Sequence, residues 1–257
     1  MKYALACLSL LILASTTAFG QDFSALDALH DSRAFEPELA GLEKLYSPAD
    51  PQAAVVFRLV RVRQQFIADL PSTMNKEKVA RFGELLDFMK PLLEKARGNA
   101  RDRATLYYWN AVVIGEKGAA KGAVEMLLGT GDIRNNCDKS IAIDPGYGDP
   151  YYLKALLDLA LPGIAGGSLS RMGQLYEKAL QLDPVNIWYL TDAAISIKHR
   201  NWDAKANKEG KNGVPAGTAD RDFAQVLARR AAAAYAALAA PSLELKGKMD
   251  AMHAAGL

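Results

Sequence analysis

The chain has 257 residues, half of them hydrophobic, with a formal net charge of +2. This length suits one extended domain or one array of helices. The near-neutral charge gives no electrostatic reason to expect nucleic acid or an anionic membrane surface as a partner.

Residues 1–20 have the pattern of a secretory signal peptide. A basic start at Lys2 precedes an apolar run over 4–14, and small residues stand at Ala18 and Gly20. We expect cleavage after Gly20 and a periplasmic or secreted product with no membrane span, since no later apolar stretch reaches about 18 residues. Two alternatives stay open: the segment is retained as an anchor, or Cys7 carries a lipid. The cleaved chain would keep only Cys137, as a core residue, and form no intrachain disulfide.

Apolar residues recur at threes and fours along most of the remaining chain, and no useful length alternates with a period of two. The sequence therefore predicts an all-α protein. The expected helices cover 24–46 (in two pieces), 53–70, 75–97, 101–115, 123–143, 150–161, 169–182, 185–199 and 219–240, with a short helix after Pro241.

Prolines, glycines and capping residues set the expected boundaries. Pro91 should kink or divide the helix over 75–97. Glycines should loosen the chain after 115 and divide the helix over 123–143 near Gly129. The expected N-caps are Asn75, Asp149 and Ser168.

Two loops stand out by composition. Residues 203–218 are rich in lysine, glycine, alanine and asparagine, so we expect a mobile loop that buries little apolar area. Residues 161–167 form a glycine-rich tip with two open interpretations. Leu161 and Ile164 either pack against the helix pair that follows and end their helix, or they form an exposed contact for a partner.

Two stretches, 137–145 and 176–184, follow one plan: an apolar or aromatic residue, a small residue, then an Asp-Pro stop. The stops at Pro145 and Pro184 end their helices because proline lacks the N–H. This plan resembles the second half of a tetratricopeptide (TPR) repeat, whose period is about 34 residues. The resemblance covers 104–200 best. It implies a right-handed α-solenoid of degenerate TPR-like helix pairs over 21–257.

A narrower resemblance lies in residues 143–152 and in the Leu-Pro and Gly-Gly tip at 161–167. These stretches are similar to exported bacterial TPR proteins that include the T-component of TRAP transporters. In that group such a tip joins the two helices of a repeat. The resemblance implies a transporter subunit as one partner.

No catalytic or metal-binding pattern is visible. His30, His199 and His253 have no partner at a metal-ligand spacing, and the glycines at 163–167 do not follow a strand as a phosphate loop requires. The sequence predicts no cofactor, no metal and no enzyme.

A solenoid of helix pairs binds through the concave face formed by the first helix of each pair. Positions offset by threes and fours from the core positions should line that face. Either they bind a ligand or their aromatic members only pack between repeats. The candidate residues are Tyr107, Asn110, Lys117, Asp149, Tyr152, Trp188, Thr191 and Lys198, with Arg58 from the first pair.

The sequence leaves two binding functions open. The first is an exported, non-enzymatic protein that holds a protein or peptide partner in its groove. The second is an accessory subunit of a TRAP-type transporter that encloses a small organic ligand. Homo-oligomers are compatible with both.

Overall fold

The computed structural model describes residues 22–257, so the predicted signal peptide and Cys7 lie outside the described residues. The described chain is all-helical, with one isolated bridge between Gln52 and Arg97 and no strand. None of the helices in this range is long and apolar enough to cross a membrane. The elements are α1 (Ser24–Asp31), α2 (Phe35–Leu45), α3 (Ala53–Ala68), η1 (Ser72–Met74), α4 (Asn75–Met89), α5 (Leu92–Lys95), α6 (Ala100–Lys121), α7 (Ala123–Ile143), α8 (Asp149–Ala160), η2 (Gly163–Ala165), α9 (Leu169–Leu182), α10 (Ile187–Arg200), α11 (Asp220–Ala236) and α12 (Leu243–Ala254).

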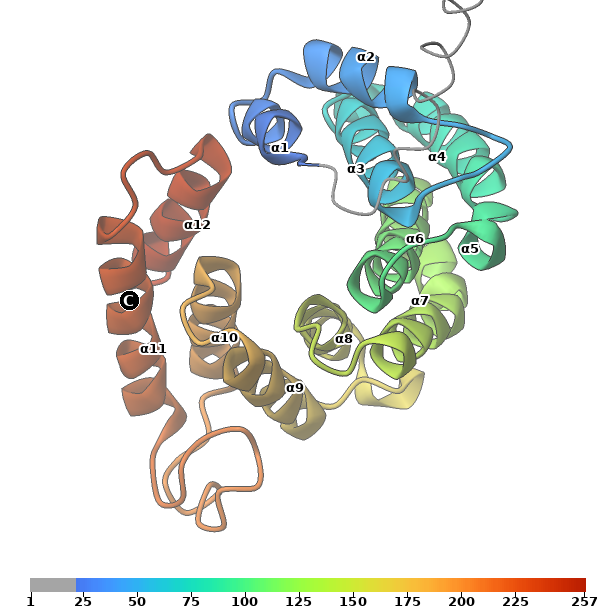
Figure 1. Ribbon diagram of the computed structural model, residues 1–257. Helices are drawn as coiled ribbons and strands as arrows, with labels where there is room; N and C mark the ends of the chain where they lie inside the picture. Colours follow the sequence, from blue (N-terminus) through green and yellow to red (C-terminus); the bar gives the residue numbers. More distant parts are fainter. Residues whose placement is uncertain (1–21) are drawn as a thin grey trace, which may run out of the picture.

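Consecutive helices pack as neighbours and follow one another around a ring (Figure 1). The pairs α6–α7, α8–α9 and α10–α11 each pack side by side. In Figure 1, α8 and α10 lie toward the inside of the ring, and α4, α7 and α11 lie toward its outside. The first and last helices come close to each other, and Arg33 after α1 contacts Glu244 of α12 at 3.0 Å.

Three clusters of buried apolar side chains hold the helices together. The first surrounds α3, whose Val56, Leu59 and Val60 are fully buried. The second joins α8 to α12 around Tyr176 and Leu190. The third lies between these two and is small, consisting of Ala111, Ile133, Cys137, Leu157 and Leu161.

Several predicted boundaries agree with the structure. Pro91 separates α4 from α5, as expected for a residue that breaks helical hydrogen bonding. The Ser168 hydroxyl accepts a hydrogen bond from the Arg171 N–H at 3.2 Å and so caps α9. Cys137 is buried as predicted.

The expected caps at Asn75 and Asp149 are wrong. Both residues are the first residues of their helices, and neither side chain caps its own helix. The Asp149 carboxylate instead accepts hydrogen bonds from the hydroxyls of Tyr147 and Tyr189.

The glycines of α6 and α7 do not break their helices, contrary to the prediction. Helix α6 continues through Gly115 and Gly118 to Lys121, and α7 is unbroken across Gly129 and Gly131. A Cβ on Gly118 would lie 3.0 Å from the Met126 Cα. Close approach of the two helices therefore explains the absence of a side chain there.

Residues 203–218 form turns, as expected, but the segment is packed against its neighbours. Val214 is only 2% exposed, so the expectation that little apolar area is buried fails there. Asp220 accepts hydrogen bonds from Arg200 at 2.7 Å and from Asn207 at 2.8 Å, and both carboxylate and guanidinium are fully buried. This buried ion pair fixes both ends of the segment.

The tip at 161–167 fits neither interpretation fully, because its buried leucine packs with the preceding helices α6 and α7 and not with the pair that follows. Leu161 is buried in the third cluster, and Ile164 is fully exposed. Gly166 has a φ of +84°, a conformation that favours glycine.

Candidate functional site

The face of the ring that α3, α6, α8 and α10 turn toward its middle is called the inner face here. From the pattern of helix pairs in the sequence, we expected this face to form a continuous groove. In the structure, other helices of the same chain contact both of its ends.

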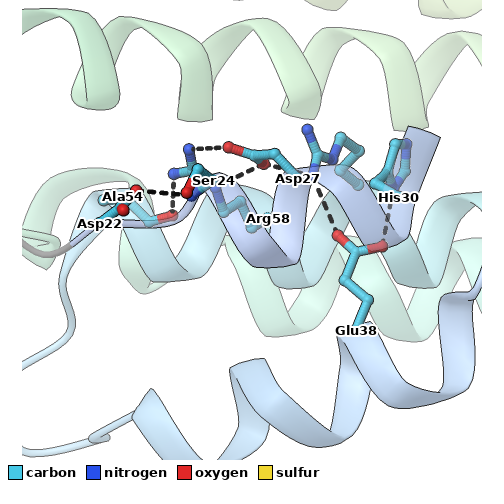
Figure 2. Close-up of polar contacts among 8 residues, drawn as sticks. Asp22, Ser24, Asp27, His30, Glu38, Ala54 and Arg58 are labelled. Atoms are coloured by element: carbon cyan, nitrogen blue, oxygen red, sulfur yellow. Dashed lines mark hydrogen bonds and ion pairs between the residues drawn. The ribbon is translucent and has the colours of Figure 1, made fainter. Parts of the chain in front are cut away.

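At the first end, α1 packs on α2, and ion pairs join it to α3 (Figure 2). None of the residues of α1 is buried. The Arg58 guanidinium donates to both oxygens of Asp27, at 2.9 and 2.7 Å. The Arg61 guanidinium donates to Asp27 at 2.8 Å and to Glu38 at 3.0 Å. The Glu38 carboxylate also lies 2.9 Å from the His30 Nδ1. The predicted groove residue Arg58 therefore has its partner within the chain.

These contacts change the acidity of Asp27. Partial burial raises the pKa of its carboxyl, but hydrogen bonds and charge from Arg58 and Arg61 outweigh this effect. The resulting pKa is below its ordinary value. Asp27 therefore stays ionised and keeps α1 attached to α3.

At the other end, α12 lies against α10. The Lys248 amine contacts Asp192 at 2.6 Å and lies 4.7 Å from the centre of the Trp188 ring. The Lys198 amine donates to the carbonyls of Ala255 and Gly256, at 2.5 and 2.9 Å. The predicted groove residues Trp188 and Lys198 thus contact α12 and the residues that follow it.

Tyrosines and aspartates join α8 to α10. The Tyr152 hydroxyl donates to Asp192 at 2.5 Å, and its ring stacks on that of Tyr189 at 5.1 Å. Tyr189 in turn donates to Asp149, and burial raises the pKa of Asp149 above its ordinary value. Thr191 is fully buried and donates to the Ile187 carbonyl. Tyr152, Asp149 and Thr191 therefore serve helix packing.

The candidates on α6 contact neighbouring helices. Tyr107 donates from its hydroxyl to Glu94 at 2.8 Å. Asn110 is buried and donates to Asn136 of α7 at 2.9 Å. Lys117 lies beside Gly83 of α4. The structure thus brings the nine predicted residues into several helix contacts and does not assemble them into one site.

The structure also has a feature that the sequence-based predictions did not include. A crevice of about 240 Å³ opens between α6, α7 and α8, and we call it the α6–α8 crevice. It has room because its α6 wall carries alanines and a glycine, which face larger side chains of α7 and α8. Its lining residues are Ala111, Val112, Gly115, Glu116, Ala119, Met126, Ile133, Leu153, Leu156, Leu157 and Ala160.

Glu116 is the only ionisable residue in this lining. Within residues 22–257 its carboxylate makes no hydrogen bond or ion pair. Burial raises the pKa of Glu116, and the charge of Lys78 opposes this only in part. The crevice is therefore an apolar pocket with a single unpaired carboxyl group.

The residues of the crevice suit binding better than covalent chemistry. Cys137 is close by in the third cluster, but burial raises the pKa of its thiol to about 12, which leaves the thiolate scarce. In the described part of the chain, no group of three or more His, Cys, Asp or Glu side chains is placed to hold a metal.

A sequence signal for the crevice did exist. Ala111, Gly115 and Ala119 recur every four residues and so lie on one face of a helix, next to Glu116. A prediction that ended the helix at Gly115 could not place them on a common face. The lining residues of the crevice were therefore missed because the predicted helix ended too early, at Gly115.

No model of a known protein family matches the chain, and a search of curated proteins finds no match either.

Proposed function

We propose that this chain is a non-enzymatic binding protein that holds a small, mainly apolar ligand in the α6–α8 crevice. The observation that carries this proposal is the lining, which is apolar except for Glu116. Ligand pockets are commonly of this kind, with an apolar wall and few polar groups. Among the lining residues, Glu116 is joined by neither a nucleophile nor a second acid or base, which favours binding over catalysis.

The contacts at the ends of the inner face favour a small ligand over a long peptide. A peptide lying along the inner face would meet α1 at Arg58 and α12 at Trp188. The volume of about 240 Å³ also favours a small ligand. A cavity of about 150 Å³ holds benzene, so a ligand of on the order of ten heavy atoms is a reasonable upper size.

The finer architecture and the biological setting also belong to this proposal. We propose that α6–α7, α8–α9 and α10–α11 are degenerate TPR-like pairs of a right-handed solenoid. Support comes from Tyr176 and Ala179, which are buried between helices as the pattern requires. An exported accessory subunit of a TRAP-type transporter is the setting that best fits a small ligand.

Filling the crevice tests the proposed function. Gly115→Leu should place a side chain in the space that Gly115 leaves open beside Ile133. Native mass spectrometry of the purified chain should detect a bound small molecule, and this variant should lose it. Gly131→Leu is the matched control, because a Cβ there meets nothing within 4 Å. Retention of the same molecule by Gly115→Leu would rule out the crevice as its site.

A further inference from the structure

We propose that the ligand of the α6–α8 crevice is an apolar amine, whose ammonium group pairs with the Glu116 carboxylate while its hydrocarbon part contacts the apolar wall. This inference rests on the proposed function and adds the chemical class of the ligand.

The first argument is the missing partner of Glu116. A carboxylate that is partly removed from water is costly unless a cation or hydrogen-bond donors compensate it. The other lining residues are apolar and carry no side-chain donor. A cationic ligand would supply that missing partner.

The second argument is that the lysines on the surrounding helices do not pair with Glu116. On α4, the Lys78 amine donates to the Ala68 carbonyl at 2.7 Å. Lys121 of α6 pairs with Glu125 of α7 at 3.0 Å. Lys154 of α8 pairs with Asp138 of α7 at 2.5 Å. Lys117 of α6 lies beside Gly83 of α4. None of these cations makes an ion pair with Glu116.

The third argument is the arrangement of the lining around Glu116. Val112 and Glu116 are four residues apart on α6, so they lie on one face of that helix. Leucines at 153, 156 and 157 of α8 complete the opposite wall. An apolar wall next to one carboxylate suits a molecule with a hydrocarbon body and a positively charged end. An apolar anion would be repelled by Glu116, and an apolar alcohol would leave the carboxylate without a charged partner.

Three probes of nearly equal size test this inference: cyclohexylmethylamine, cyclohexylmethanol and cyclohexanecarboxylate. Binding to the full chain is measured by isothermal titration calorimetry at pH 7.5. The amine should bind about tenfold more tightly than the alcohol, as expected for one charge-assisted contact. The carboxylate should bind more weakly than both.

Two variants localise the effect. Glu116→Gln should lower the affinity for the amine to that for the alcohol and leave the affinity for the alcohol unchanged. Glu125→Gln is the matched control, because Glu125 lies on α7 outside the crevice lining and pairs with Lys121. Its affinities should equal those of the unmodified chain. Circular dichroism should report the same helix content for all three proteins.

The pH dependence adds a second readout. Affinity for the amine should fall as the pH is lowered through the raised pKa of Glu116, and affinity for the alcohol should stay constant. Equal binding of amine and alcohol would overturn the amine inference and leave the proposed function intact. Tighter binding of the carboxylate would also overturn it. Failure of all three probes would count against the crevice as a binding site.

Discussion

At the scale of the residue, the environment of an aromatic side chain decides its role. The repeat pattern placed Tyr176 between helices, and the structure confirms this. The Tyr176 side chain is only 1% exposed, and its hydroxyl shares a hydrogen bond with the Ser196 hydroxyl. The pattern also placed Trp188 on the concave face. It could not show that α12 returns and sets Lys248 over the indole ring, because that contact joins distant parts of the chain.

Truncating these two aromatic residues should have different effects. Tyr176→Ala removes a fully packed ring and should lower the free energy of unfolding by about 3–5 kcal/mol. Trp188→Ala should cost less than half as much, because its ring is only partly buried. Urea unfolding of both variants measures the difference. An equal loss would show that Trp188 is a core residue.

Asp27 should make the free energy of unfolding depend on pH. Its pKa is below the ordinary value in the folded chain, so its pairing with Arg58 stabilises the fold above the unfolded pKa of about 3.9 and is lost as the pH falls through the folded pKa. Asp27→Asn should therefore be less stable than the unmodified chain at pH 7, and this gap should close below about pH 4. Asp31→Asn, on the same helix and exposed, should show no such gap. Chemical unfolding over a pH series compares them.

At the scale of the element, helical periodicity located the helices well, and glycine was misleading. A glycine inside a helix costs stability, so its local signal is a break. In α6 that local cost is offset by packing that the sequence does not show. Gly118 lies against the Met126 backbone and Gly115 lies beside Ile133. Pro91 gave the right boundary because its effect is local.

Alanine substitutions separate the two kinds of glycine. Gly131→Ala should raise the free energy of unfolding by about 0.5–1 kcal/mol, because the position is helical and a Cβ there meets nothing within 4 Å. Gly118→Ala should lose this gain, since its Cβ would lie 3.0 Å from the Met126 Cα. Thermal unfolding ranks the pair. A Gly118→Ala variant as stable as Gly131→Ala would show that α6 and α7 can separate freely.

The segment at 203–218 should depend on its buried ion pair. Asp220→Asn leaves Arg200 buried without its countercharge and should cost about 3–5 kcal/mol. Trypsin should then cleave faster after Lys205, Lys208 or Lys211. Asp222→Asn, in the first turn of the same helix and exposed, is the control. Equal cleavage rates in both variants would mean that the ion pair does not hold the segment.

At the scale of the whole molecule, the predicted binding residues and the α6–α8 crevice differ, since none of the nine predicted residues lines the crevice. The sequence indicated a binding face on the first helices of successive pairs. It could not reveal that α1 covers the face at Arg58 and that α12 covers it at Trp188, because these are contacts between distant segments. The α6–α8 crevice depends on side chains from three helices, so its volume follows from packing and not from local pattern.

The contact between the ends of the ring should govern shape more than stability. Glu244→Lys replaces the attraction to Arg33 by repulsion, yet both side chains are about one-third exposed, and such pairs contribute about 0–1 kcal/mol. Spin labels placed at Asp31 and Leu243 should report a longer and broader distance distribution in the variant. Glu36→Lys, at an exposed site on α2, is the control. An unchanged distribution in Glu244→Lys would show that other contacts close the ring.

The meeting of Arg33 and Glu244 also bears on how this chain folds. A linear repeat array folds through contacts between adjacent units, so ordering can begin anywhere and spread. The contact here joins residues 211 positions apart, which adds a closure of very high contact order to an otherwise local set of contacts. Local ordering can complete each helix pair early, but the ends can meet only after the intervening pairs have set their curvature. The contact between Arg33 and Glu244 therefore depends on the packing angle of every intervening helix pair, and small deviations in these angles add up at that contact.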